Sequence, residues 1–346
     1  MRVGILTAGG DCPGLNAVIR AASRRLMVDG HQPVGLLRGY RGWAEPELRM
    51  ELDDRAVSGI LHLGGTILST SSFDPFMEPD GVERVLKAQE TDPLDAVIAI
   101  GGEHTQWITQ KIHQQLGLPV VGVPKTIDND VVGTDYTFGF DTAVQVATEA
   151  IDRLHTTAQS HDRVMVVEVM GRNSGWIALY SGIAGGADGI LVPEIDITVE
   201  ELVKTIERRH ERGKNFSIIV VAEGAKLAFE GQEGEQVLAS EETDEYGYVR
   251  LGGIAALLGR ELEKRTGFET RITVLGHTQR GGTPSATDRV LATRYGLKAA
   301  EMVLAGEFGR MATLLDNKIT SISLDQVDGV KPIDFAMLDE AKVFFG

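Results

Sequence analysis

Short, nearly continuous apolar runs alternate along this chain with amphipathic stretches of helical period, such as Leu15–Met27 and Glu201–Gly213. Strands that are apolar throughout are buried on both faces, which is typical of parallel sheets covered by helices. The runs are too numerous for one compact sheet. The pattern therefore predicts two doubly wound α/β domains, each with a mostly parallel sheet. The predicted strands are Arg2–Thr7, Asp95–Gly102, Pro119–Pro124, Arg163–Gly171, Gly189–Glu194, Phe216–Gly224 and Ile272–His277.

Composition and charge narrow the class of partner. Of the 346 residues, 42% are hydrophobic and 24% are charged, as in an ordinary soluble globular protein. No apolar run approaches the roughly 18 residues of a membrane span, and the first ten residues lack signal-peptide features. The net charge of −16 argues against nucleic acid and against an anionic membrane as partners. With Cys12 as the lone cysteine, we expect a cytoplasmic protein without an internal disulfide, in which the acidic stretch Glu230–Tyr246 is a solvated loop or hairpin.

Two glycine-rich segments are candidate phosphate sites. The segment Thr7–Asn16, TAGGDCPGLN, follows the first predicted strand and leads into a helix. Its glycines would let backbone N–H groups approach a phosphate at the helix N-terminus. A tight strand–helix turn explains the same pattern without a ligand. The segment His62–Ser72, HLGGTILSTSS, is open to the same two interpretations.

Carboxylates follow two of the predicted strands. Glu103, in GGEHT, is either a ligand for Mg²⁺ or an acid at a helix N-terminus. In PKTIDND, Thr126, Asp128 and Asp130 alternate beside Lys125, so the two acids would point the same way if the chain stays extended. One is then a candidate general base for a hydroxyl, and the other orients it or binds metal. The alternative is an Asx-turn with capping aspartates.

Cationic side chains lie at the starts and ends of separate predicted strands. In so acidic a chain, this set suggests a pocket for an anion, and the glutamate among its members would suit a sugar hydroxyl. Ligands of open parallel sheets bind beyond the carboxyl ends of the strands, so we expect these motifs to converge on one site. The set comprises Arg163, Arg172, Glu223, Arg271, His277 and Arg280.

At this point several motifs together resemble the bacterial 6-phosphofructokinase family over nearly the full length of the chain. The resemblance is strongest to the branch that has a glutamate in GGE and a lysine in PKTIDND, which holds both ATP- and pyrophosphate-dependent enzymes. It implies phosphoryl transfer to the 1-hydroxyl of fructose 6-phosphate, a step of glycolysis, in a cleft between the two domains. The motifs, in order, are GGDCPGLNAVIR, PKTIDND, FGFDTA, VEVMGR, VVAEG and LGHTQRGGTP.

The resemblance also implies domains and residue roles. The donor-binding domain would comprise 1–138 with about 252–305, and the fructose 6-phosphate domain 139–251 with about 306–346. Asp128 would be the base, Asp130 would sit beside it, and Glu103 would hold Mg²⁺. Arg163 and Arg271 would reach the acceptor site from a neighbouring subunit of a homodimer or homotetramer. The remaining implied residues are Lys125 and Thr126 at the transferred phosphoryl group, Gly9, Gly10, Ser72, Gly102, His104 and Thr105 for the donor, and Met170, Gly171, Arg172, Glu223, His277 and Arg280 for the sugar phosphate.

The donor side departs from the family pattern at four positions. His104 and Trp107 stand where nucleotide-using relatives keep glycine, and both side chains add bulk. Ser69 replaces a glycine, and Ser72 replaces an arginine that touches the transferred phosphate. Pyrophosphate carries no nucleoside that could clash, so we expect it to be favoured over ATP. The alternative from another class is a catalytically weak paralogue that binds sugar phosphate and regulates an active partner.

Overall fold

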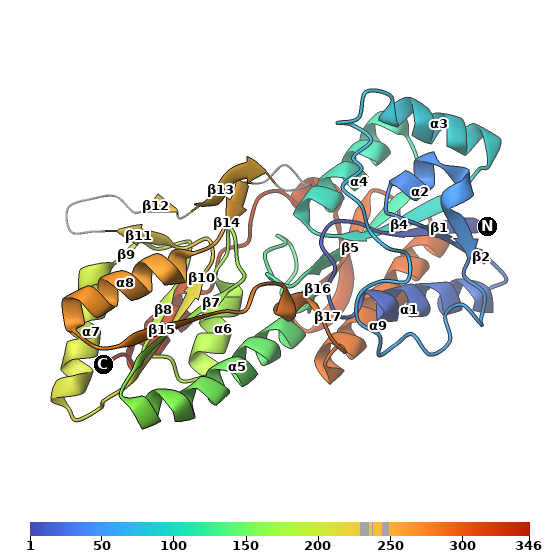
Figure 1. Ribbon diagram of the computed structural model, residues 1–346. Coiled ribbons are helices and arrows are strands. Elements are labelled where there is room, and N and C mark those ends of the chain that lie inside the picture. The colour runs from blue at the N-terminus through green and yellow to red at the C-terminus, as the bar shows by residue number, and fades with distance from the viewer. Residues whose placement is uncertain (229–234, 237, 244–248) are drawn as a thin grey trace. The chain divides into compact units, whose positions relative to one another are not determined.

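The structure is a computed structural model that describes residues 1–228, 235–236, 238–243 and 249–346 (Figure 1). The chain forms two compact units. No helix in the described ranges is long and apolar enough to cross a membrane. Unit 1 comprises Met1–Ile127, Val131–Thr142 and Arg280–Val330, and unit 2 comprises Asp128–Asp130, Ala143–Gln279 and Lys331–Gly346.

Unit 1 is built on a sheet with the order β17-β16-β5-β4-β1-β2-β3, and β6 pairs with β5. The central strands are parallel, and the outermost pairs, β2 with β3 and β16 with β17, are antiparallel. β4 and β5 are buried at every residue, which explains their continuous apolar sequence. The strands are β1 (Arg2–Thr7), β2 (Gln32–Leu36), β3 (Arg49–Glu51), β4 (Ala96–Gly101), β5 (Val120–Thr126), β6 (Phe138–Gly139), β16 (Arg310–Leu315) and β17 (Lys318–Ser323).

Helices flank this sheet, and α1 packs along α9 (Figure 1). A hydrophobic cluster beneath α2, α3 and α4 includes Leu36, Trp43, Val97 and Ile108. The helices of unit 1 are α1 (Leu15–Val28), α2 (Arg41–Ala44), α3 (Gly81–Thr91), α4 (Glu103–Leu116) and α9 (Ala286–Ala305), with 3-10 turns η1 (Pro46–Leu48) and η3 (Leu324–Gln326).

Unit 2 is built on a parallel sheet with the order β15-β7-β10-β8. Its smaller strands form two further short sheets, in one of which β13 pairs with β14. Much of the predicted acidic hairpin, Glu230–Tyr246, lies outside the described residues. The elements are β7 (Val164–Val169), β8 (Gly189–Leu191), β9 (Ile197–Thr198), β10 (Ser217–Ala222), β11 (Lys226–Ala228), β12 (Glu235–Gln236), β13 (Leu238–Thr243), β14 (Val249–Leu251), β15 (Thr270–Val274), α5 (Phe140–His161), α6 (Trp176–Ala184), α7 (Val199–Glu211), α8 (Ile254–Thr266) and α10 (Phe335–Lys342), with the 3-10 turn η2 (Gly276–Arg280) at the end that continues into unit 1.

The predicted α/β class with mostly parallel sheets is confirmed, but the compact units differ from the predicted domain ranges. Residues 252–279, expected with the first domain, carry β15, which pairs with β7 in unit 2. Residues 306–330, expected with the second domain, carry β16, which pairs with β5 in unit 1. Pairing with strands far apart in the sequence determines the unit to which each segment belongs. The local pattern of apolar residues does not reveal such pairing.

Asp288, in the first turn of α9, is a buried carboxylate within unit 1. It accepts hydrogen bonds from the backbone N–H of Thr142, at 2.8 Å, and from the Thr142 hydroxyl. Its own N–H donates to the hydroxyl of Ser285, which in turn donates to Asp141. Burial raises the pKa of Asp288 to about 6, because desolvation outweighs these hydrogen bonds and the nearby Asp141 carboxylate also disfavours ionisation.

We expect Asp288 to make folding depend on pH. Its folded-state pKa lies above the ordinary value of about 4, so the folded protein binds more protons between the two values. The stability that this group contributes is present below about pH 4 and is lost as the pH rises through about 6. Asp288→Asn does not ionise, so its free energy of unfolding should rise relative to wild type by about 2–3 kcal/mol across that interval. Urea denaturation of both proteins through this interval measures the difference, and a difference independent of pH would contradict the assignment.

Candidate active site

The first glycine-rich segment forms a turn at the carboxyl edge of the unit 1 sheet, directly after β1. Lys125, near the end of β5, donates a hydrogen bond to the carbonyl of Gly10. Arg280 donates from Nη1 to the carbonyl of Asp11, at 3.3 Å. Two cationic side chains from distant parts of the sequence therefore contact one turn. In a chain with a net charge of −16, these two side chains form a local cluster of cations.

The other face of this turn meets the start of α4. A Cβ built on Gly9 would lie 3.6 Å from Lys125 Nζ and 3.8 Å from Thr105 Oγ1. β4 lies between β1 and β5 in the sheet, so the residues that follow these three strands meet at one edge. Gly102 is the N-cap of α4 and has an extended backbone. The predicted donor residues Gly9, Gly10, Gly102 and Thr105 are thus brought together with Lys125.

The second glycine-rich segment is fixed beside the first by side chains that the sequence did not single out. Buried Asn16 donates from Nδ2 to the carbonyls of Leu63, at 3.1 Å, and Gly64, at 3.2 Å. Thr70 donates from its hydroxyl to the carbonyl of Gly9, at 2.7 Å. Gly64 has no room for a Cβ, because the carbonyl of Gly282 lies against it. Three glycine-rich motifs therefore meet in unit 1.

Two of the four departures from the family pattern lie in this second segment. Ser69 has a φ of 56°, in the left-handed region that favours glycine and costs other residues about 1 kcal/mol or more. The serine occupies a backbone conformation that suits the glycine of the family pattern. Ser72, where the pattern has an arginine, is exposed.

Glu103 is the first residue of α4, where a carboxylate interacts favourably with the helix dipole, as one of the two interpretations of this residue predicts. Its side chain is also partly exposed, on the helix whose N-terminus adjoins the glycine turn. Among the described residues there is no group of three His, Cys, Asp or Glu that could hold a metal by themselves. Mg²⁺ commonly takes one or two carboxylates together with phosphate oxygens and water. A single carboxylate such as Glu103 therefore fits a Mg²⁺ ion whose other ligands are water and the oxygens of a phosphate donor.

His104 and Trp107 do not stand in the same environment. His104 Nε2 lies 3.0 Å from Asp74 Oδ2, and its ring stacks on Trp107 with centroids 5.3 Å apart. The side chain of His104 is 54% exposed. The ring of Trp107 meets Phe76 edge-on and packs against the core of unit 1. Trp107 therefore packs beneath the His104 ring. Of the two side chains, mainly that of His104 adds exposed bulk at the start of α4.

The chain does not stay extended through PKTIDND. β5 ends at Thr126, and Asn129 adopts a left-handed backbone with a φ of 51°. The condition under which Asp128 and Asp130 would point the same way, a chain extended through both residues, is therefore not met. Asparagine tolerates this conformation better than other non-glycine residues. Lys331 holds the turn from Nζ to Asn129 Oδ1, at 3.1 Å, and from its N–H to the Asp130 carbonyl, at 2.8 Å.

The predicted acceptor residues of unit 2 gather where β7, β10 and β15 end. The N–H of Glu223 donates to the carbonyl of Val169, at 2.8 Å, and the N–H of Gly224 donates to the carbonyl of Gly171, at 3.0 Å. Gly224 admits no Cβ, because the carbonyl of Arg172 lies against it. The N–H of Met170 donates to fully buried Gln279, at 3.4 Å, which ties this loop to the turn that carries His277. Gln279 is a positioning residue that sequence reasoning missed.

Arg163 and Arg271 lie at the opposite ends of the strands of the same sheet, away from the acceptor loops. β15 and β7 are parallel, with Thr270 opposite Val164, so both arginines are at the amino ends of their strands. About five or six residues at 3.3 Å each, roughly 15–20 Å, separate them from the carboxyl ends. The expectation that all the cations form one pocket is therefore wrong within one chain, because parallel strands send their two ends to different edges.

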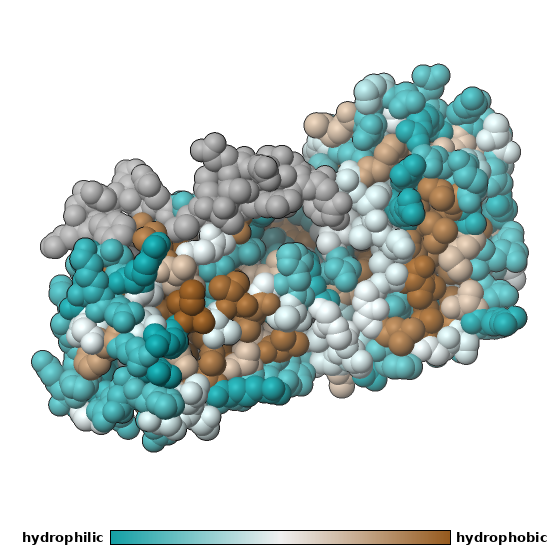
Figure 2. Space-filling model, in the orientation of Figure 1, coloured by the Kyte–Doolittle hydropathy of each residue, from teal (hydrophilic) through white to brown (hydrophobic). Residues whose placement is uncertain are grey.

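The two arginines share Glu269. Arg163 Nε lies 2.9 Å from Glu269 Oε2, and Arg271 pairs with the other oxygen of the same carboxylate. The hydrogen bond from Arg163 lowers the pKa of Glu269, and the charge of Arg271 lowers it further. On the same edge strand Ile272 and Val274 are 45% and 55% exposed, and hydrophobic residues gather over the strands of this sheet (Figure 2).

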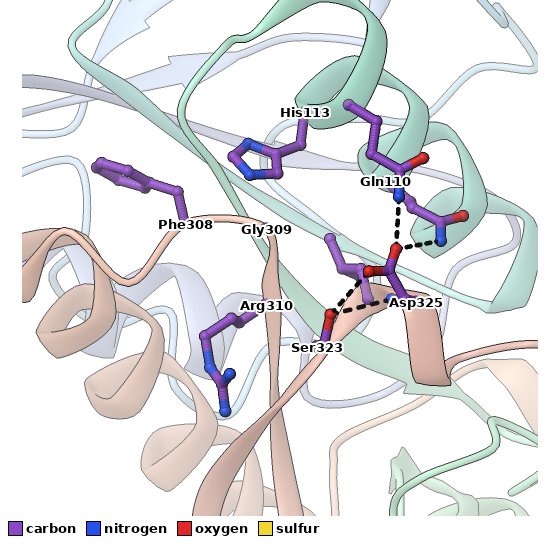
Figure 3. Close-up of a pocket in the computed structure, with 9 residues that line it drawn as sticks. Gln110, His113, Phe308, Gly309, Arg310, Ser323 and Asp325 are labelled. Atoms are coloured by element: carbon purple, nitrogen blue, oxygen red, sulfur yellow. Dashed lines mark hydrogen bonds between the residues drawn. The ribbon is translucent and has the colours of Figure 1, made fainter.

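A separate pocket of about 410 Å³ lies in unit 1, at the C-terminal half of α4. Asp325 is turned toward Gln110 on α4, whose Nε2 donates to it at 2.8 Å, and toward Ser323 (Figure 3). Arg310 lines the pocket and is hydrogen-bonded to Ser321. None of the predicted site residues lines this pocket, so it is distinct from the glycine turn.

The chain is similar to known proteins over its full length. Residues 2–303 match the family described as Phosphofructokinase. The chain is 51% identical to a pyrophosphate–fructose 6-phosphate 1-phosphotransferase of Streptomyces coelicolor, with both chains fully covered. It is also 51% identical to ATP-dependent 6-phosphofructokinase 3 of the same species, with 99% of each chain covered. Among solved structures, Pichia pastoris phosphofructokinase in the T-state superposes with a TM-score of 0.81 at 32% identity; the match covers 94% of this chain and 35% of that one.

Proposed function

The chain belongs to the phosphofructokinase family, and we propose that it transfers a phosphoryl group from pyrophosphate to the 1-hydroxyl of fructose 6-phosphate. The family predicted from the sequence motifs is confirmed. The observation that carries the proposal is the meeting of the glycine turn, Lys125, Arg280 and the start of α4 at one edge of the unit 1 sheet. Backbone N–H groups, a helix N-terminus and cations are what a phosphate donor requires.

On the donor side, catalysis of this kind rests on positioning and electrostatics. The N–H groups of Gly9 and Gly10 contact the donor phosphates, and Lys125 supplies positive charge. Glu103 would hold Mg²⁺, which neutralises phosphate charge when it is bound. The Thr126 hydroxyl contacts the phosphoryl group in transfer.

On the acceptor side, Asp128 removes the proton of the sugar 1-hydroxyl as the new P–O bond forms and the bond to the leaving phosphate breaks. Asp130 lies next to Asp128 in the turn that Lys331 holds, and it orients the reacting groups. Fructose 6-phosphate is bound by the loops after β7, β10 and β15. That these loops and the donor turn face one cleft stays a prediction. The proposed sugar-phosphate residues are Met170, Gly171, Arg172, Glu223, His277 and Arg280.

The position of Arg163 and Arg271 supports an oligomer. In their own chain they lie at the edge of the unit 2 sheet away from the acceptor loops, so they serve a sugar phosphate only in a neighbouring copy. Ile272 and Val274 expose apolar surface on the same edge strand, where a second copy would cover it. We therefore propose a homodimer or homotetramer with shared acceptor sites.

Overall similarity does not separate the donors, because relatives of one species named for pyrophosphate and for ATP are equally identical to this chain. The choice between pyrophosphate and ATP must therefore depend on the side chains at the donor site. His104 is exposed at the start of α4, beside the glycine turn. An imidazole there restricts ribose and adenine but leaves room for pyrophosphate.

Asp128→Asn tests the catalytic base. It should lower kcat by about 100-fold or more, the range typical of lost general-base catalysis, and change the KM for fructose 6-phosphate by less than about threefold. Asp152→Asn, an exposed site on α5, is the matched control and should retain full activity. A coupled assay with purified protein, Mg²⁺ and each donor measures both variants, and a fall in kcat of less than about tenfold would remove Asp128 from this role.

The donor is tested in the same assay. Wild-type protein should react faster with pyrophosphate than with ATP, and His104→Gly should raise kcat/KM for ATP relative to pyrophosphate by about tenfold, the size of one removed steric conflict. Trp107 is left in place, because its loss would open a cavity against the core of unit 1. Efficient use of ATP alone would refute the steric argument. Sugar-phosphate binding without turnover from either donor would favour the regulatory paralogue.

Shared sites are tested by hybrid complementation. Asp128→Asn and Arg271→Ala subunits should each be nearly inactive. In a dimer with shared sites, random mixing makes half of the dimers hybrid, and each hybrid has one intact site, so about a quarter of wild-type activity should return. Mixing Asp128→Asn with Glu223→Ala is the control, because both residues belong to the same chain's site and no intact site forms. A fully active monomer by light scattering would exclude the model.

A further inference from the structure

Asp74 is a nearly buried carboxylate in unit 1 to which the proposed mechanism assigns no role. Its Oδ1 accepts from the backbone N–H of Phe76, at 2.8 Å, and its Oδ2 lies 3.0 Å from His104 Nε2. A buried carboxylate is tolerated only with such partners. One partner is local backbone, which any turn supplies. The other is a side chain thirty positions away, at the start of the helix beside the donor turn.

This contact fixes one edge of the imidazole. Burial alone would raise the pKa of Asp74, but the hydrogen bonds from His104 and from Phe76 outweigh it and lower the pKa below its usual value. The carboxylate is then ionised at neutral pH and can only accept hydrogen bonds. His104 Nε2 must therefore carry a hydrogen and donate a hydrogen bond to Asp74 Oδ2.

The face of the imidazole is fixed as well. His104, Trp107 and Lys111 have i, i+3 and i+7 spacing and lie on one face of α4. The imidazole stacks on the indole with an interplanar angle of 19°, and Lys111 Nζ lies 3.6 Å from the indole centroid. Phe76, whose N–H holds Asp74, also contacts the indole. The Asp74 loop and α4 thus position the ring from two directions, while about half of the side chain stays exposed.

We propose that Asp74 is a positioning residue for donor choice: it pins His104 beside the donor turn so that the imidazole excludes a nucleoside. The inference rests on the proposed function and deepens it. An unpinned histidine on an exposed helix turn can rotate away from a bulky donor at little cost. A histidine held by a charge-assisted hydrogen bond and a stack must break both contacts first. Excluding a nucleoside therefore requires the contact with Asp74 as well as the size of the imidazole ring.

The test compares Asp74→Asn with the matched control Glu78→Gln, an exposed carboxylate of the same loop. Asp74→Asn should shift the ratio of kcat/KM values toward ATP by about tenfold, the worth of one charge-assisted hydrogen bond, chiefly through the KM for ATP. Glu78→Gln should leave the ratio unchanged. In a His104→Gly background, Asp74→Asn should add less than about twofold, because its effect passes through the imidazole. A full shift without His104 would show that Asp74 acts through general loss of structure and would overturn the proposal.

Two measurements without turnover separate this inference from the proposed function. Calorimetric titration with imidodiphosphate and with the β,γ-imido analogue of ATP should show the same shift in relative affinity. Long-range ¹H–¹⁵N spectra of the histidines should show the Nε2–H form of His104 in wild type and a changed signal in Asp74→Asn. Wild type that binds neither analogue refutes the proposed function and this inference with it. Donor binding with an unchanged His104 signal, or an unchanged affinity ratio, overturns the role of Asp74 alone.

Discussion

Parallel strand direction is the constraint on which the glycine turn of unit 1 and the acceptor loops of unit 2 both depend. In unit 1, β1, β4 and β5 run the same way, so the glycine turn, the start of α4 and Lys125 meet at one edge. In unit 2, β7, β10 and β15 run the same way, so three separate loops meet at one edge. The same constraint sends Arg163 and Arg271 to the other edge. Strand direction therefore separates the residues that lie at the carboxyl ends of the strands from Arg163 and Arg271, which serve the proposed acceptor site only if a neighbouring subunit contributes them.

Elements buried on both faces were predictable, and their partners were not. β1 has the predicted ends, and β4 differs from prediction by one residue at each end, because burial on both faces leaves an unbroken apolar run. β2 was missed, since its five residues include a proline and a glycine. β16 and β17 were missed because partly exposed residues interrupt their apolar pattern. Pairing across more than a hundred positions, as between β15 and β7, placed two segments in different units from those expected.

At the site, motifs identified residue types at strand ends but not the contacts that orient them. The placement of Lys125 on the glycine turn follows from the strand order, in which β4 lies between β1 and β5; the apolar pattern predicted parallel strands but not that order. The left-handed Asn129 was not anticipated, and it interrupts the extended backbone on which the alternation of Asp128 and Asp130 depended. Asp74 lies in a loop without periodicity, so nothing in its neighbourhood pointed to His104. Such side-chain contacts between distant segments are visible only once the backbone is folded.

Lys125 illustrates how an acidic protein can build a phosphate site in advance. The residue is only 3% exposed, and its ammonium group contacts a neutral backbone carbonyl of the glycine turn. An ionised phosphate oxygen adds a Coulombic attraction to the ammonium group that a neutral carbonyl lacks, so it is the stronger acceptor for this lysine. The turn thus keeps the cation beside the proposed phosphate site before any donor binds, and little reorganisation is needed afterwards. With a net charge of −16, long-range attraction does not favour an anionic donor, so the proposed phosphate site relies on this local preorganisation for its affinity.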